Sequence, residues 1–302
     1  MEIFDLKTMA KADIIEKTIV ALGTFDGCHF AHKRVLSSAF YEAKRLGVKS
    51  VAYTFYSAPR ADVKQIFTIE EKIKAISRLG IDYIALENFE NVKDMAPDDF
   101  FQEVLIDKLN AVGASCGYNY KFGKGAAANC DTLKGYFSKI GRGSVVVCEK
   151  MTIEGEPVSS TLLRSLVENG EVEKLYAYGS NYSVISKVEY GKRLGTKIGF
   201  PTINQSFPVE KVVPKKGVYI TECEIGEDVY PSITNVGIRP SVDDSHELNF
   251  ETYIIGYSGL LYGSHIRVNF YKFLRDEKRF ASVDELKNQI AIDTEASKKY
   301  FK

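Results

Sequence analysis

The chain has 302 residues, enough for about two domains of ordinary size that each bury a core. Its 40 lysines and arginines balance 40 aspartates and glutamates, which argues against a protein that binds nucleic acid or an anionic membrane surface. The five cysteines form no C-x-x-C pair and no metal-ligand spacing, a pattern typical of reduced thiols in a cytosolic protein.

The N-terminal segment, Met1 to Ala10, carries charges where a signal peptide needs an apolar run. No later stretch approaches the roughly 20 apolar residues of a membrane-spanning helix. We therefore expect a cytoplasmic protein without a membrane span.

The first half of the chain alternates short apolar runs with longer amphipathic stretches, as parallel α/β structure does. Strands are expected at Thr18 to Leu22, Ser50 to Phe55, Tyr83 to Leu86, Ala111 to Cys116 and Ser144 to Cys148. Helices are expected at Ala31 to Leu46, Ile69 to Leu79, Pro97 to Leu109 and Thr132 to Ile140. This pattern predicts an α/β doubly wound sheet that binds its ligands beyond the carboxyl ends of the strands.

After about residue 180 the pattern changes to turns and alternating strands. Strands are expected at Tyr182 to Glu189, Gly217 to Glu224, Val229 to Asn235, Leu248 to Ile255 and Ile266 to Phe273. They predict a small antiparallel β-barrel, and a C-terminal helix over about Val283 to Tyr300 is expected to pack on it. We therefore expect an α/β domain over residues 1–180 and a barrel domain over residues 181–302.

The first expected strand ends in Gly23-Thr-Phe-Asp-Gly-Cys-His-Phe-Ala-His32, and a helix follows at once. His29 and His32 stand three residues apart at the start of this helix and point the same way. They add hydrogen-bond donors to a helix N-terminus that already favours anions, which suits nucleotidyl transfer because attack on an α-phosphate builds negative charge on oxygen. For this motif alone, a solvent-facing histidine pair or a metal site that adds Cys28 is the alternative.

A second half for such a site is offered by Val158-Ser-Ser-Thr-Leu-Leu-Arg164. Ser159 or Ser160 can cap a helix that begins here, and Arg164, about one turn later, can reach a phosphate with its forked guanidinium. A capped helix with a surface arginine is the alternative interpretation.

A basic, glycine-rich stretch opens the second half: Gly191-Lys-Arg-Leu-Gly-Thr-Lys-Ile-Gly-Phe-Pro-Thr-Ile-Asn204. Its three glycines let the backbone come close to a bulky anion, and its lysines and arginine add positive charge. Pro201 stiffens the chain before Thr202 and Asn204, whose hydroxyl and amide can bind a metal ion and the phosphates that it carries. The stretch predicts a phosphate site, with a basic hairpin loop as the alternative.

Together, the two motifs of the first half resemble the H-x-G-H and S-S-T-x-x-R signatures of a nucleotidyltransferase superfamily. The form Gly-x-Phe-Asp-Gly-x-His is similar to the FMN adenylyltransferase module of bacterial bifunctional riboflavin kinase/FAD synthetases, and Gly117-Tyr-Asn-Tyr-Lys-Phe-Gly123 resembles a further segment of that module. The resemblance implies that His29, His32 and Arg164 serve adenylyl transfer. It implies substrate contacts from Gly23, Phe25, Asp26, Gly27, Asn119, Ser160 and Thr161.

Two positions depart from the pattern of that module. Ala31 places a methyl group where the family has the glycine of H-x-G-H. The second expected strand is followed by Phe55-Tyr-Ser-Ala-Pro-Arg60, where the family has Phe-x-Pro-His-Pro, so the histidine of that segment is absent.

In the second half, Gly-Phe-Pro-Thr-x-Asn resembles the signature of riboflavin kinases. Leu248-Asn-Phe-Glu-Thr-Tyr-Ile254 resembles the family strand that supplies the general base, and alternation puts Glu251 on the opposite face from Phe250 and Thr252. The resemblance implies that Glu251 is the kinase base and that Thr202 and Asn204 bind Mg²⁺. It implies phosphate or flavin contacts from Gly191, Lys197, Gly199, Pro201 and Arg275.

The resemblance runs the length of the chain and implies an enzyme that uses ATP and Mg²⁺ in two reactions. One phosphorylates riboflavin to FMN and releases ADP, and the other adenylylates FMN to FAD and releases pyrophosphate. A monofunctional riboflavin kinase with a weakened α/β domain is the first alternative, because of the two departures. The others are a flavin-binding regulator without turnover, and an α/β domain that adenylylates another phosphorylated small molecule.

Overall fold

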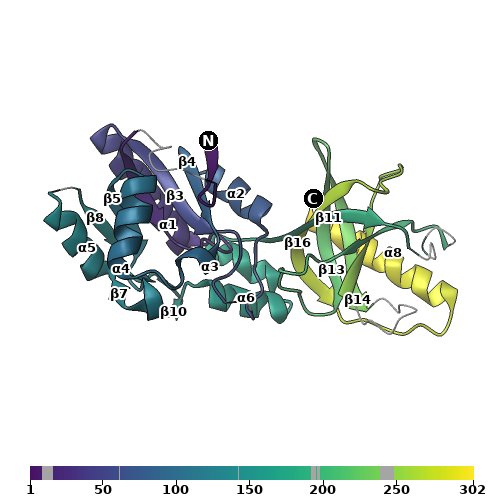
Figure 1. Ribbon diagram of the computed structural model, residues 1–302. Helices are drawn as coiled ribbons and strands as arrows, with labels where there is room; N and C mark the ends of the chain where they lie inside the picture. The colour runs from purple at the N-terminus through teal and green to yellow at the C-terminus, as the bar shows by residue number, and fades with distance from the viewer. Residues whose placement is uncertain (9–15, 61, 142, 192–194, 196–197, 239–247) are drawn as a thin grey trace. The chain divides into compact units, whose positions relative to one another are not determined.

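The computed structural model describes residues 1–8, 16–60, 62–141, 143–191, 195, 198–238 and 248–302. The chain forms two compact units, an N-terminal unit of Met1–Leu162 and a C-terminal unit of Leu163–Lys302, and each is described by itself (Figure 1). No helix within these described ranges has both the length and the apolar composition that crossing a bilayer requires.

In the described part of the N-terminal unit, six parallel strands form one sheet in the order β1-β4-β3-β2-β5-β8. The strands are β1 (Glu2–Asp5), β2 (Thr18–Leu22), β3 (Lys49–Phe55), β4 (Tyr83–Glu87), β5 (Ala111–Gly117) and β8 (Val145–Cys148). The helical segments are α1 (Phe30–Leu46), α2 (Ile69–Ser77), α3 (Phe89–Val92), α4 (Pro97–Asp99), η1 (Phe100–Lys108), η2 (Lys124–Ala126) and α5 (Cys130–Lys139). Short two-residue strands pair as β6 (Lys121–Phe122) with β7 (Ala128–Asn129), and β9 (Thr152–Ile153) with β10 (Glu156–Pro157).

The predicted doubly wound α/β fold is confirmed, and local chemistry explains where its elements begin and end. All five residues of β2 are buried, as expected for an apolar strand covered on both faces of a parallel sheet. The helix α2 begins with a capping box between Thr68 and Glu71, and α1 ends at Gly47, whose φ of 67° favours glycine. The edge strand β1 was not predicted, because it is four residues long and half of it is exposed.

The strand order places a topological switch point at the middle of this sheet. The chain runs from β2 to β3 on one side of β2, and returns later to β5 on the other side. The connections after β2 and β5 therefore diverge and leave a crevice at the carboxyl ends of these two strands. This is where the sequence predicts the nucleotide site.

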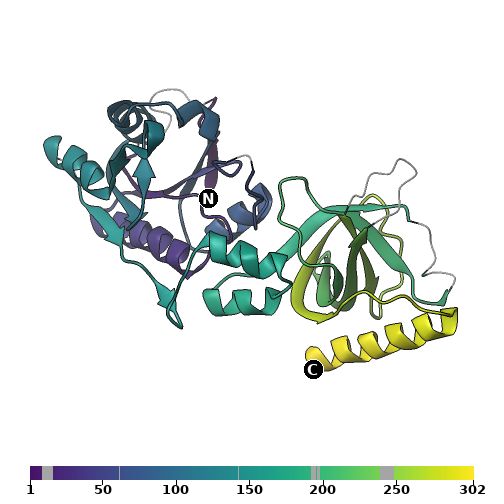
Figure 2. The ribbon, with the colours of Figure 1, turned by 90° about the horizontal axis from the view of Figure 1, so that it is seen from below.

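The C-terminal unit contains a closed antiparallel barrel, as predicted, with the order β11-β12-β15-β14-β13-β16 in its described residues. Its elements are β11 (Tyr182–Glu189), β12 (Thr202–Ser206), β13 (Gly217–Ile225), β14 (Asp228–Ile238), β15 (Leu248–Ile254), β16 (His265–Arg275) and α8 (Val283–Tyr300). The strand β12 was not predicted, since the residues before it read as a phosphate-binding loop. Figure 2 shows the barrel with α8 alongside it.

The barrel interior combines apolar side chains with a chain of hydroxyl groups. Thr221 shares hydrogen bonds with Ser232 and Thr234, and Thr234 shares one with Thr252, each at 2.8 Å. Because hydroxyl groups both donate and accept, this chain satisfies buried polar atoms without a charge. It also establishes that Thr252 points into the barrel.

The predicted packing of α8 on the barrel is confirmed. Ser297 donates a hydrogen bond to the carbonyl of Ser232 on β14 at 3.0 Å, and Asp293 and Thr294 are also buried. Leu286 and Ile290, on the same side of the helix as Asp293, are half-buried, whereas Ile292 is exposed. The face of α8 towards the barrel therefore combines apolar and polar side chains.

The two units divide within α6 (Ser160–Glu168), earlier than the boundary at residue 180 that the change in sequence pattern suggests. The segment after α6, η3 (Val172–Tyr178), contacts β16 of the barrel, and the rings of Tyr176 and Tyr271 stack there with centroids 5.9 Å apart. The C-terminal unit thus contains a helical segment before its barrel strands. The alternating strand pattern in the sequence does not predict this segment.

Candidate active sites

A pocket of about 760 Å³ opens at the carboxyl end of the parallel sheet, a volume in the range of small-molecule sites. We call it the sheet-edge pocket. The segments that line it follow β2, β3 and β5 and precede α6. His29, His32 and Asn119, which the sequence predicts at the site of adenylyl transfer, all lie in its wall. The pocket therefore occupies the switch point of the sheet, as predicted.

The two histidines of this pocket form a stacked pair at the start of α1. His29 is the N-cap, and its Nδ1 accepts a hydrogen bond from the backbone N–H of His32 at 3.3 Å. Their ring centroids are 3.7 Å apart with an interplanar angle of 18°. Since Nδ1 of His29 is an acceptor, the proton of the neutral ring is on Nε2, where it can be donated.

Burial keeps both imidazoles uncharged. It lowers the pKa of His29 to about 4, and it lowers the pKa of His32 well below its ordinary value. Repulsion from a positive charge on His29 or on Lys72 lowers the pKa of His32 further. Near neutral pH both rings are therefore neutral, and each has one N–H group that can donate a hydrogen bond.

The loop between β2 and α1 has an unusual backbone that other segments hold in place. Phe25 and Cys28 have φ of 50° and 38°, and Gly27 has φ of 74°. Such values cost free energy for residues other than glycine and persist where the surroundings enforce them. A Cβ on Gly23 would lie 2.7 Å from the Phe25 ring, so glycine is required at that position.

Asp26 is the anchor of this loop. One of its oxygens, Oδ1, accepts the backbone N–H groups of Ile66 and Phe67 at 2.9 and 3.0 Å, and its carbonyl accepts the hydroxyl of Ser160 at 2.8 Å. Gly23 and Phe25 line the sheet-edge pocket, whereas Asp26 and Gly27 are absent from its described lining. The structure thus gives Asp26 a role in shaping the loop.

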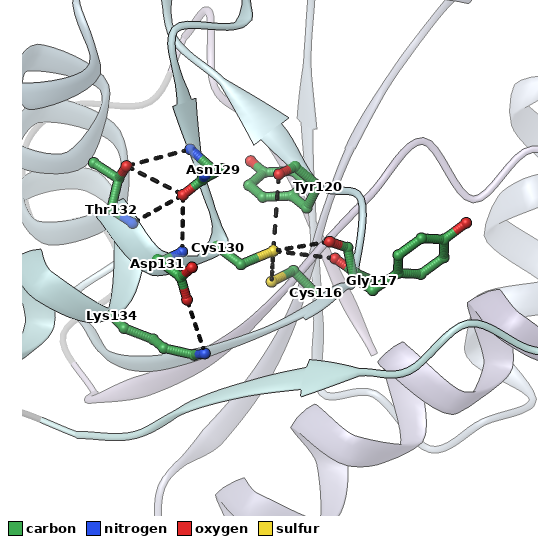
Figure 3. Close-up of polar contacts among 9 residues, drawn as sticks. Cys116, Gly117, Tyr120, Asn129, Cys130, Asp131, Thr132 and Lys134 are labelled. Carbon is green, nitrogen blue, oxygen red and sulfur yellow. Dashed lines mark hydrogen bonds and ion pairs between the residues drawn. The ribbon is translucent and has the colours of Figure 1, made fainter.

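The segment after β5 carries Asn119 into the pocket wall and is tied to α5 by a thiol. Cys130, the first residue of α5, donates from Sγ to the carbonyl of Gly117 at 3.3 Å, and its Sγ lies 3.7 Å from that of Cys116 (Figure 3). Asn129 caps the same helix by accepting from the N–H groups of Asp131 and Thr132 (Figure 3). All five cysteines are buried and free, which agrees with the predicted reduced thiols.

The segment before α6 supplies the last part of the wall. Ser159 caps α6, since its hydroxyl accepts from the N–H of Leu162 at 3.3 Å, and Ser159 and Ser160 both line the pocket. Thr161 is exposed and is not part of the described lining. Arg164 lies further along α6, in the C-terminal unit.

The structure also places the two departures from the adenylyltransferase pattern. Ala31 lines the pocket from the first turn of α1, where any residue adopts the helical backbone, so its methyl group introduces no backbone strain. Pro59 lines the pocket in the segment that lacks the Pro-His-Pro histidine, and Arg60 is absent from the described lining.

A second candidate site lies on the outer face of the barrel. Asn204 on β12 is directly opposite Glu251 on β15, and Glu251 is directly opposite Asn235 on β14. Opposed residues of antiparallel strands project to the same face. Phe250 and Thr252 are buried inside, so Glu251 projects outward, as the predicted alternation requires. We call Asn204, Glu251 and Asn235 the barrel row.

Gly191 and Gly195 of the glycine-rich segment lie close to the Asn204 end of the barrel row. A Cβ on Gly191 would lie 2.5 Å from Nδ2 of Asn204, and one on Gly195 would lie 2.3 Å from the carbonyl oxygen of Phe200 and 3.3 Å from Oγ1 of Thr202. These approaches explain why Asn204 is buried although it is on the outer face. Gly199 has φ of 88° and precedes Phe200 and Pro201. Lys192, Arg193 and Lys197 lie outside the described residues.

Thr202 and Asn204 fit a magnesium ion that is carried by a nucleotide. Both present neutral oxygen donors, and Thr202 pairs with Tyr253, two residues beyond Glu251. The described residues contain no cluster of three histidine, cysteine, aspartate or glutamate side chains that could hold a metal by itself. Mg²⁺ typically takes one or two protein oxygens and completes its shell with phosphates and water, which this donor set allows.

Arg275, predicted near flavin or phosphates, is engaged within the C-terminal unit. Its guanidinium forms an ion pair with the buried Asp293 of α8, with Nη2 to Oδ2 at 2.7 Å, and it also donates to the carbonyl of Asp276. This pair joins the end of β16 to α8. Sequence reasoning missed two features that the packing reveals, Asn235 in the barrel row and the buried Lys72 next to the histidine loop.

Comparison with known proteins matches a different family model to each half of the chain. Residues 11–162 match the family model described as FAD synthetase, and residues 178–301 match the one described as riboflavin kinase. A Buchnera aphidicola protein named bifunctional riboflavin kinase/FMN adenylyltransferase is 32% identical to this chain, over 95% of each sequence. The chain belongs to the bifunctional riboflavin kinase/FMN adenylyltransferase family.

Other members of this family align along nearly the whole chain. The Bacillus subtilis relative is 29% identical over 94% of this chain and 93% of its own, and the Escherichia coli relative is 28% identical over 95% and 93%. A crystal structure titled as a macrolide-efflux protein from Streptococcus pneumoniae superposes with a TM-score of 0.87, at 26% identity, over 99% of this chain and 98% of that one.

The two family matches separate the two sites. The range matched by FAD synthetase contains the histidine pair and Asn119, and the range matched by riboflavin kinase contains Thr202 and the barrel row. Each half of the bifunctional family is therefore represented by a unit of the chain with its own candidate site.

Proposed function

We propose that this chain catalyses two consecutive reactions, the ATP-dependent phosphorylation of riboflavin to FMN and the adenylylation of FMN to FAD. The barrel carries the kinase and the α/β unit carries the adenylyltransferase, with the functional boundary near residue 180. The observation that carries the kinase assignment is the direct opposition of Asn204 and Glu251 on neighbouring strands. Family membership supports two activities over the monofunctional kinase alternative.

In the kinase reaction, Glu251 accepts the proton of the ribityl 5′-hydroxyl as this oxygen attacks the γ-phosphorus of ATP, and ADP leaves. The exposed position of Glu251 allows a substrate hydroxyl to approach it. Gly191, Gly199, Pro201 and Lys197 belong to the segment that we assign to the phosphates of ATP. We also assign Arg275, at the end of β16, to phosphate or flavin binding.

Thr202 and Asn204 would hold Mg²⁺ together with the phosphates. When bound, the ion neutralises phosphate charge and keeps the transferred group in line. The protein's own contribution is to hold the two side chains at fixed positions: Asn204 is fixed in the β12–β15 register, and Thr202 directly follows Pro201.

In the adenylyl transfer, a phosphate oxygen of FMN attacks the α-phosphorus of ATP, a new phosphorus–oxygen bond forms, and pyrophosphate leaves. The neutral imidazoles of His29 and His32 donate hydrogen bonds to the phosphate oxygens on which negative charge builds. We propose that Arg164 stabilises the same negative charge on the phosphate oxygens. We assign substrate binding to Gly23, Phe25, Asn119, Ser160 and Thr161. Asp26 and Gly27 shape the loop. We also propose a cytoplasmic location.

A single assay tests both activities. The purified full chain is incubated with riboflavin, ATP and MgCl₂, and the flavins are separated by chromatography over time. We expect FMN to appear first and FAD to follow. FMN without FAD would instead identify a monofunctional kinase with a weakened α/β unit. Neither product, with flavin bound, would identify a flavin-binding regulator.

A further inference from the structure

Lys72 is a buried lysine next to the sheet-edge pocket that no step of the proposed reactions uses. It lies on α2, is 1% exposed, and donates from Nζ to the carbonyl of Phe55, the last residue of β3, at 2.8 Å. Lysine is rarely buried without compensation, because removing an ammonium group from water is costly. The position of Lys72 therefore indicates a specific role.

The compensating charge is Asp26 in the histidine loop. Its carboxylate attracts the ammonium of Lys72, while burial acts in the opposite direction and lowers the pKa of Lys72 to about 8. Asp26 is itself 6% exposed and holds the N–H groups of Ile66 and Phe67, which directly precede α2. The hydrogen bonds of Asp26 and Lys72 thus connect the loop after β2, the end of β3 and the start of α2.

The same ammonium also acts on His32, one of the two imidazoles of the pocket. His32 contacts the stacked ring of His29 and the edge of the Phe25 ring, whose centroid is 5.5 Å away, and the positive charge of Lys72 lowers its pKa. A nearby cation opposes a positive charge on the ring.

We propose that Lys72 is a positioning residue for adenylyl transfer, which holds the end of β3, and with it Phe55 in the wall of the sheet-edge pocket, against α2. This inference rests on the proposed adenylyltransferase activity. It gives Lys72 a role in catalysis, whereas a lysine that only stabilises the fold would affect the stability of the protein alone. The two roles differ in how the rate depends on pH.

Two variants separate these roles. Lys72→Met removes the charge with little change in length, and Lys72→Arg keeps a charge that does not titrate below about pH 12. Lys74→Met, an exposed lysine on the same helix, is the matched control. FAD formation from supplied FMN and ATP is measured for kcat and KM from pH 5 to 9.5. Formation of FMN from riboflavin by the same preparation reports that the chain is intact.

For Lys72→Met we expect kcat for FAD formation to fall by about tenfold or more, because small displacements of catalytic groups are costly. The acid limb of the kcat profile should move to higher pH, since protonation of His32 becomes easier. KM should change by less than about threefold, and FMN formation and Lys74→Met should match the wild type.

Lys72→Arg provides an independent test that does not require the methionine variant to fold. The wild-type rate should fall on the alkaline side as Lys72 loses its proton near pH 8, and the arginine variant should lose this limb while it keeps the acid limb. Wild-type protein that forms no FAD would overturn the proposed function and this inference together. Wild-type protein that forms FAD, with both limbs unchanged in the two variants, would overturn this inference alone.

Discussion

Asn204 and Glu251 lie directly opposite each other on neighbouring antiparallel strands, 47 positions apart in the sequence. Both project to the outer face of the barrel, next to Asn235 on the following strand. A carboxylate that can accept a proton is therefore beside an amide that can bind a metal nucleotide. The strand register holds these groups together, and the predictions for the kinase depend on it.

Replacement of Glu251 by glutamine should preserve the fold and lower FMN formation by at least ~10²-fold, as expected for the loss of a general base. FAD formation from supplied FMN should be unchanged, since it uses the other unit. The matched control is Glu227→Gln, in the exposed turn between β13 and β14, which should leave both rates unchanged. Near-normal FMN formation by Glu251→Gln would remove Glu251 from the role of base.

Replacement of Gly191 by alanine tests the glycine-rich segment. The added Cβ would lie 2.5 Å from Nδ2 of Asn204, closer than real contacts allow, so the amide must shift. We expect FMN formation to fall by about tenfold, in the range that misplaced groups cause, and FAD formation to persist. Gly135→Ala in α5, where a Cβ meets no atom within 4 Å, should keep both rates and stabilise its helix. Equal rates for the two variants would show that Asn204 need not hold its position.

For the adenylyl transfer, His29→Ala and Arg164→Ala should each abolish FAD formation while FMN formation continues. Loss of a fixed donor to developing charge commonly costs about 10²- to 10³-fold in rate. His265→Ala, at the exposed start of β16, is the control for histidine substitution. Both rates are measured on the same preparation, so a combined loss of FMN and FAD would indicate misfolding and contradict the specific roles.

The buried histidines should also make the N-terminal unit sensitive to acid. His29 has a pKa of about 4 in the folded protein, against about 6.5 in the unfolded chain. Between these values the unfolded chain binds a proton that the folded chain does not, so the free energy of unfolding decreases as pH falls. For His29 alone the decrease reaches about 2 kcal/mol by pH 5, and His32 adds to it in the same direction.

Urea unfolding at pH 7.5 and pH 5, combined with hydrogen exchange of peptides from α1, measures this loss in the N-terminal unit. His29→Gln should make stability less dependent on pH over this interval, whereas His265→Gln should behave as the wild type. A wild-type N-terminal unit that is equally stable at both pH values would contradict the burial of neutral imidazoles.

Much of the fold could be predicted because local pattern and local chemistry agree in this chain. Runs such as Ile19 to Leu22 are apolar throughout and are typical of buried strands, and α2 begins at a capping box that is visible in the sequence. The strands β1 and β12 were missed for opposite reasons. The first is too short and exposed to show a pattern, and the second follows a loop whose glycines and basic residues conceal its beginning.

For the candidate sites too, some features follow from the sequence and others only from the tertiary structure. The sequence by itself determined which residues are candidates for the chemistry, because glycine, histidine and the Thr-x-Asn pair appear at spacings that suit phosphate binding. Only the tertiary structure decided that Asn204 lies opposite Glu251, that Asp26 accepts the N–H groups of Ile66 and Phe67, that Lys72 is buried against Phe55, and that Arg275 pairs with Asp293. Strand register and buried charge pairs depend on packing between distant segments, which periodicity within one segment does not encode.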